Sequence, residues 1–126
     1  LKMSTYVNSF AHSSGGATPF HSRTLNSSAS PVSIGAGRLY SFDALNVSAN
    51  DIYLKFYDEA SGSVNPASDT PFLGPFLVQA GVGMERRCVE GIQFNTQISV
   101  RAVHNLVDND TASPTANDLL FNAEYK

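Results

Sequence analysis

Short stretches of alternating apolar and polar residues recur along this chain, separated by segments rich in Gly, Pro, Asn and Ser. The clearest stretch is residues 52–58, where Ile52, Leu54 and Phe56 fall on one face of an extended strand. We expect that face to be core. The opposite face should be an amphipathic surface on which tyrosines reach solvent. Its members are Tyr53, Lys55 and Tyr57.

Further strands are predicted by the same alternation. Residues 35–48 read as two strands joined by a kink, and others are expected at 91–94, 97–105 and 119–125. Pro75 interrupts an apolar run and predicts an edge strand or a bulge there. Residues 84–89 are the best candidate for a single helical turn. About eight short strands at spacings of roughly 8–12 residues predict an all-β, antiparallel β-sandwich. Local patterns do not separate a jelly-roll-like topology from an immunoglobulin-like one, and the strand count slightly favours the jelly roll.

Residues 1–26 differ in composition from the rest of the chain. They are polar and small, contain a Ser-Ser-Gly-Gly run at 13–16, and carry isolated aromatic residues such as Tyr6, Phe10 and Phe20. We interpret 1–26 as an extended N-terminal arm, with residues 4–10 a strand when docked, and 27–126 as the β-sandwich domain. A disordered tail is the alternative, but such a tail has little need of spaced aromatics.

Composition restricts the function classes. The chain has 126 residues, of which 42% are hydrophobic and 15% charged, with a formal net charge of −3. This is enough apolar material for one folded domain. The low content of Lys and Arg argues against nucleic acid as the main partner. No apolar run approaches the roughly 18 residues of a membrane helix, and the first residues do not resemble an export signal. A single cysteine, Cys88, excludes an internal disulfide.

Catalytic, cofactor and metal sites are not expected. No Gly-x-Ser-x-Gly elbow accompanies His12, His21 or His104. Spaced carboxylates in a loop can bind calcium, but the glycine turn and the bidentate Glu of a calcium loop are missing. We favour turn chemistry for these carboxylates. They are Asp108, Asp110 and Asp118.

A charged segment at residues 85–90 is the most distinctive candidate for a protein contact. Arg86 and Arg87 flank Cys88 among glutamates, which indicates either a solvated, self-paired cluster or an interface against a carboxylate-rich neighbour. Cys88 itself reads as a small buried hydrophobic residue rather than a reactive thiol, although the arginines leave a lowered pKa open. The complete set of expected partner contacts is Tyr6, Phe10, Phe20, Arg23, Arg86 and Arg87.

Residues 24–126 resemble a family of small β-sandwich virion proteins of tailed bacteriophages. The features occur in order: a Gly-Arg-Leu-Tyr strand at 37–40, the strand YLKFYD at 53–58, and the segment TPFLGPFLVQAG at 70–81. The ending has a Gly-Ile-x-Phe strand at 91–94, the loop DNDT at 108–111 and a last strand that closes with Tyr125. Each motif is weak alone, whereas the order and spacing together are moderately specific.

The resemblance implies a non-enzymatic capsid decoration or cement protein, commonly a homotrimer, that clamps neighbouring major capsid subunits. Such a protein is made in the host cytoplasm and lies on the capsid surface of the virion. Nucleic acid, membrane and cofactors are not among its expected partners. The alternative is a glycan- or receptor-binding module of a tail fibre, spike or head appendage, with Tyr53 and Tyr57 as a stacking platform. Burial of these tyrosines at a subunit interface is the competing interpretation.

Overall fold

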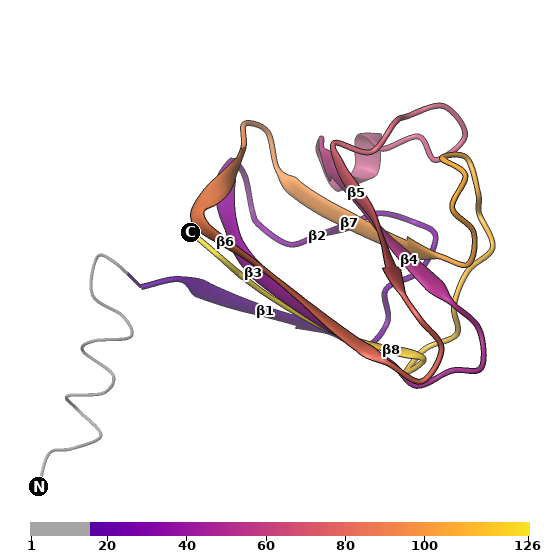
Figure 1. Cartoon of the computed structure of the whole chain (residues 1–126). Helices are drawn as coiled ribbons and strands as arrows, with labels where there is room; N and C mark the ends of the chain where they lie inside the picture. Colours follow the sequence, from indigo (N-terminus) through magenta and orange to yellow (C-terminus); the bar gives the residue numbers. More distant parts are fainter. Residues whose placement is uncertain (1–15) are drawn as a thin grey trace, which may run out of the picture.

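The computed structural model describes residues 16–126 as a β-sandwich of two four-stranded antiparallel sheets (Figure 1). One layer, here called sheet A, contains β1, β3, β6 and β8, and the other, sheet B, contains β2, β4, β5 and β7. The all-β prediction is confirmed. The strands are β1 (Thr18–Ser22), β2 (Ser30–Pro31), β3 (Gly37–Asn46), β4 (Ile52–Asp58), β5 (Leu73–Val78), β6 (Gly83–Phe94), β7 (Ile98–Val103) and β8 (Leu119–Tyr125), with a 3₁₀ turn, η1, at Ser61–Ser63.

The strand order is β1-β8-β3-β6 in sheet A and β2-β7-β4-β5 in sheet B. The pairs β1–β8, β2–β7, β3–β6 and β4–β5 are those of a chain folded back once on itself and then rolled into two layers. This wiring is compatible with the jelly-roll topology that the strand count favoured. It places the first and last strands side by side, so both ends of the domain meet in sheet A.

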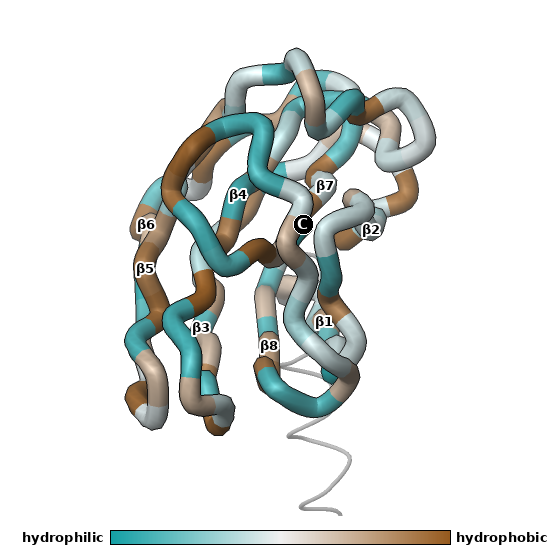
Figure 2. The backbone as a smooth tube through the Cα atoms, turned by 90° about the vertical axis from the view of Figure 1, so that its right-hand side faces the viewer, coloured by the Kyte–Doolittle hydropathy of each residue, from teal (hydrophilic) through white to brown (hydrophobic). Residues whose placement is uncertain are grey.

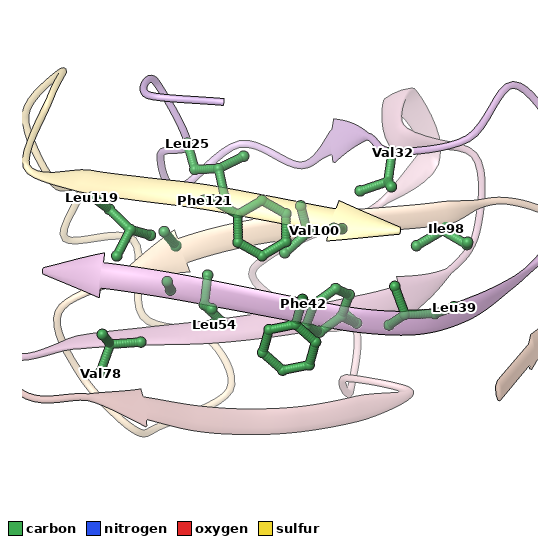
Figure 3. Close-up of a cluster of buried hydrophobic side chains, with 14 of the residues drawn as sticks. Leu25, Val32, Leu39, Phe42, Leu54, Val78, Ile98, Val100, Leu119 and Phe121 are labelled. Carbon is green, nitrogen blue, oxygen red and sulfur yellow. The ribbon is translucent and has the colours of Figure 1, made fainter. Parts of the chain in front are cut away.

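The core fills the space between the two sheets. Figure 3 shows inward side chains from both layers, among them Phe42 and Phe121 of sheet A and Leu54 of sheet B. The rings of Phe42 and Phe56 lie 4.9 Å apart between centroids, and those of Phe42 and Phe76 lie 5.1 Å apart. Figure 2 shows hydrophobic and hydrophilic segments alternating along the backbone. This is the period-two pattern that predicted the strands.

The N-terminal boundary lies earlier than we placed it. Residues 18–22, assigned to the arm, form β1 and pair with β8 from Thr18↔Tyr125 to Ser22↔Phe121. Leu25 is only 2% exposed and belongs to the core cluster. The sandwich therefore includes the end of the expected arm. Residues 1–15, with the expected strand at 4–10, lie outside the described residues.

Two local expectations for sheet A are corrected. Residues 84–89 form no helical turn but belong to β6, which pairs with β3 from Gly37↔Phe94 to Leu45↔Gly83. Charged side chains suit this strand because it is an edge strand and faces solvent. The two strands expected at 35–48 are one strand, β3, with an irregularity in its pairing between Leu39 and Ser41.

The expectation for Pro75 is confirmed, because β5 is an edge strand of sheet B. Its register against β4 shifts between Leu54 and Phe56, next to Gly74, whose φ is +100°. Within residues 16–126, no helix is long and apolar enough to cross a membrane.

Candidate functional site

Sheet A ends at β6, which pairs only with β3 among the described strands. Ser41 is opposite Arg87 and Leu39 is opposite Ile92, so residues 88–91 of β6 lie opposite Tyr40 alone. The extra residues make a bulge in which the Val89 side chain is 93% exposed. Gly91 has φ +79°, and a Cβ there would lie 2.9 Å from the Tyr40 ring. Glycine therefore permits both the backbone conformation and the close approach of Tyr40.

The expected contact residues at the N-terminal end have different surroundings. Tyr6 and Phe10 lie outside the described residues. Phe20, on β1, is half-buried and packs edge-on against Phe121 with ring centroids 6.1 Å apart. Arg23 follows β1 and is exposed, while its carbonyl accepts a hydrogen bond from the Asn117 N–H. Of these residues, Arg23 therefore presents its side chain to solvent, whereas Phe20 stabilises the domain.

Both expected arginine contacts lie on β6 and are exposed. The Arg86 guanidinium lies 5.4 Å from the centroid of the Phe76 ring and covers the open edge between the sheets. Arg87 forms an ion pair of 3.2 Å with Glu85, in which both side chains remain more than half exposed. Such a surface pair is worth only about 0–1 kcal/mol. The Arg87 side chain can therefore leave Glu85 for a partner at little cost. Cys88, between these charges and Val89, is half-buried rather than buried as expected.

Two rows of side chains, polar except for Pro19, cross the outer face of sheet A, with one residue from each strand. The first row is His21, Asn122, Asp43 and Glu85. The second is Pro19, Glu124, Ser41 and Arg87. The two rows line a hollow of about 430 Å³, here called the sheet A groove. This volume is within the range of about 300–1,000 Å³ of small-ligand sites.

Hydrogen bonds between strands fix the groove side chains. His21 Nδ1 and Asn122 Oδ1 lie 2.9 Å apart, and Asn122 Nδ2 donates to Asp43 Oδ1 at 3.1 Å. In the next row the Ser41 hydroxyl donates to Glu124 Oε1 at 2.9 Å. The carboxylates of Asp43 and Glu124 thus each accept a hydrogen bond from a neighbouring strand through one oxygen. Sequence reasoning missed this groove because its members come from four strands that are distant in sequence.

The outer face of sheet B is not the exposed surface we predicted. Lys55 and Tyr57 are 0% exposed, as is Arg101 of β7 beside them. Arg101 Nε donates to the Tyr57 hydroxyl at 2.8 Å, and its two terminal nitrogens donate to the carbonyls of Asp110 (2.7 Å) and Asp108 (2.6 Å). The loop after β7 therefore covers this face. Tyr57 is buried within the chain and offers no stacking platform.

Lys55 completes this cluster by donating to the carbonyl of Val107. Burial lowers the pKa of the Lys55 ammonium, and the Arg101 charge lowers it further, against the opposing effect of Asp110 and Asp108. Burial also raises the pKa of the Tyr57 hydroxyl, although the bond from Arg101 opposes it. The cations of this face bind backbone carbonyls, so the cluster fixes a loop and is closed to a ligand.

The loop carboxylates do what turn chemistry predicts. Asp110 accepts hydrogen bonds from the backbone N–H and the side-chain amide of Asn105, at 3.1 and 3.0 Å. Asp118 accepts from the N–H of Thr115 at 2.9 Å. His104 Nδ1 lies 2.9 Å from the Asp51 carbonyl. Within the described part of the chain, no three His, Cys, Asp or Glu side chains are grouped to hold a metal ion.

Asp58, at the end of β4, anchors the turn between β6 and β7. Its carboxylate accepts hydrogen bonds from the N–H groups of Asn95, Thr96 and Gln97 at 3.0, 2.8 and 3.4 Å. Burial by itself raises the pKa of Asp58, but these three bonds outweigh it and hold the pKa below the ordinary value of 3.8. The ionised carboxylate is therefore the form that stabilises the turn.

Asp58→Ala is expected to lower the free energy of unfolding by about 1–2 kcal/mol at pH 7, because several N–H groups lose their acceptor. Because the pKa of Asp58 in the folded protein lies below its ordinary value of 3.8, the ionised carboxylate contributes its full stability at pH values above 3.8. That contribution is lost as the pH falls through the lower pKa of the folded protein. The difference between wild type and Asp58→Ala should therefore shrink below about pH 4. Urea unfolding at pH 7 and pH 3 measures it, with Glu90→Ala, on the exposed bulge of β6, as control. A difference that is independent of pH contradicts the assignment.

No family model, curated protein or solved structure matches this chain. Function is therefore inferred from the residues themselves and from how the fold arranges them.

Proposed function

We propose that this chain is a non-enzymatic structural protein of a virus particle, a decoration protein that clamps neighbouring major capsid subunits of a tailed phage head. One observation carries the proposal. The expected contact residues within the described part of the chain all lie on or directly after the two edge strands of one sheet, sheet A. Arg23 follows β1, and Arg86 and Arg87 lie on β6, whereas Phe20 on β1 packs against the core.

Edge strands are suited to attachment because their outer backbone groups are available to another chain. β6 offers twelve residues of such an edge, with the exposed Val89 and the two arginines alongside. The charges and the bulge discourage uncontrolled pairing with other strands, and at the same time they supply side chains for one specific partner. Residues 1–15 precede β1 and so join the domain at the opposite edge of the same sheet. Attachment at both edges is what a clamp requires.

The alternative, a glycan- or receptor-binding module of a tail fibre, spike or head appendage, loses its original support. It rested on Tyr53 and Tyr57 as a platform, and Tyr57 is 0% exposed. The homotrimer that the resemblance implies remains part of the proposal, with the virion surface as the location after synthesis in the host cytoplasm. Light scattering of the purified protein would measure a mass of three chains if the trimer forms without the shell.

Removal of residues 1–15 tests the proposal. The truncation must stop before Thr18, because a longer one removes β1 and its pairing with β8. Purified protein is added to particles assembled without it, and binding is measured by co-sedimentation. The truncated chain should lose binding, while its free energy of unfolding stays within about 0.5 kcal/mol of wild type.

A point-variant pair separates contact from folding in the same assay. Tyr6→Ala combined with Phe10→Ala should weaken binding, because aromatic anchors carry most of the energy of such contacts. Leu106→Ala is the control, since Leu106 is 59% exposed in the loop after β7, which covers the outer face of sheet B. Full binding by the truncated chain, or equal losses from the two kinds of variant, contradicts the proposed attachment.

A further inference from the structure

The sheet A groove has an unusual mixture of polar groups for a plain solvent-facing sheet. The carboxylates of Asp43, Glu85 and Glu124 line it together with the guanidinium of Arg87 and the amide of Asn122. One carboxylate oxygen of Asp43 and one of Glu124 accept a hydrogen bond from a neighbouring strand. The second oxygen of each carboxylate accepts no hydrogen bond from the described residues. The groove therefore offers strong acceptors and a strong donor side by side.

This mixture discriminates among classes of ligand. A small anion would be repelled, because three carboxylates outnumber the one guanidinium of Arg87, and a cation is the competing class of ligand. A metal ion lacks the grouped ligands it needs among residues 16–126. A hydroxyl group is both donor and acceptor, so a ligand rich in hydroxyls satisfies both kinds of side chain at once. Bonds to charged partners are the stronger ones, which favours carboxylates and a guanidinium as the recognition groups.

The groove continues towards Tyr40. A second hollow of about 210 Å³ shares Ser41, Arg87 and Glu124 with it and is also lined by Tyr40. A third hollow, of about 430 Å³, is lined by Tyr40 as well, together with Arg38 and Gln93. The Tyr40 ring rests against Gly91, where a side chain would collide with it. The ring is thus held in position between two hollows, with part of its surface open to a ligand.

We propose that the outer face of sheet A binds a neutral oligosaccharide. Asp43, Glu124 and Arg87 bond its hydroxyls, and Tyr40 packs against an apolar face of a sugar ring. Three adjoining hollows fit a chain of several sugar units better than one monosaccharide. The site goes beyond attachment to a capsid and does not rest on it, because Asp43, Glu124 and Tyr40 are not among the expected capsid contacts and only Arg87 is shared.

The test is isothermal titration calorimetry of the purified full chain with maltotriose, cellotriose and chitotriose. Sialyllactose serves as the acidic counterpart and spermine as the cationic one. At least one neutral trisaccharide should bind, and sialyllactose should bind more weakly than that sugar. Asp43→Asn and Tyr40→Ala should each weaken binding by about tenfold or more, which corresponds to about 1.4 kcal/mol.

Asp108→Asn is the matched control, because Asp108 is exposed and distant from the groove lining. Its affinity should equal that of wild type, and circular dichroism should show that every variant is folded. The proposal would be overturned if none of the three neutral trisaccharides gave heat at millimolar concentration, or if spermine alone did. It would also be overturned if Asp43→Asn and Asp108→Asn bound the sugar with equal affinity. None of these outcomes depends on particles, so failure here is distinct from failure of capsid attachment.

Discussion

Replacing Phe42 with alanine is expected to lower the free energy of unfolding by about 3–5 kcal/mol. Phe42 is 1% exposed and lies at the centre of a ring cluster that joins both sheets. Its ring packs against Phe56 and Phe76 of sheet B and against Phe121 of sheet A. Truncation removes this buried area and leaves a cavity that the two sheets cannot close without moving. Urea unfolding at pH 7 measures the loss.

Phe72→Ala is the matched control for this prediction. Phe72 contacts Phe94 with ring centroids 4.9 Å apart, but it is 51% exposed, so much less area returns to water. Its loss should be about 1 kcal/mol. If Phe42→Ala and Phe72→Ala cost the same, the sheets are not held together by the central ring cluster, and the packing described above is incorrect.

Arg101→Ala should cost about 3 kcal/mol of unfolding free energy, although arginine is usually a surface residue. Arg101 is 0% exposed and supplies donors to the Tyr57 hydroxyl and to the carbonyls of Asp108 and Asp110. Without it the buried Tyr57 hydroxyl and the partly buried carbonyls of Asp108 and Asp110 lose their partner, and the loop after β7 loses its attachment to the sheet. The variant should therefore also show faster amide exchange in residues 104–113, which hydrogen-exchange mass spectrometry measures.

An exposed arginine provides the comparison. Arg87→Ala removes only the surface ion pair with Glu85 and should change stability by about 0.5 kcal/mol or less. Tyr57→Phe removes a single acceptor from the Arg101 network and should have an intermediate effect of about 1 kcal/mol. An Arg101→Ala protein as stable as Arg87→Ala, with unchanged exchange in the loop, contradicts the role assigned to this cluster.

Period-two alternation predicted the inner faces of the strands, because burial in a sandwich follows that period directly. Ile52, Leu54 and Phe56 are all 0% exposed, as expected from residues 52–58. The outer face of the same strand was misjudged for a physical reason. Its polar side chains are covered by a loop that comes some fifty residues later, and no local pattern records that contact.

Long-range pairing explains the other differences. β1 is a strand because it pairs with β8, about a hundred residues away, so its sequence alone resembled an arm. β6 is highly charged because it is an edge, and an isolated charged segment is easily taken for a helical turn. The sheet A groove is assembled from four strands, and only the register of those strands brings Asp43, Asn122 and Arg87 together.

The copy number of this chain in purified particles tests the central proposal most directly. Quantitative mass spectrometry of purified particles of the virus that encodes this chain would give the ratio of this chain to the major shell protein. A decoration protein repeats with the symmetry of the shell, so we predict a fixed ratio with copy numbers comparable to those of the shell subunit. A few copies per particle, or none, would contradict a decoration role.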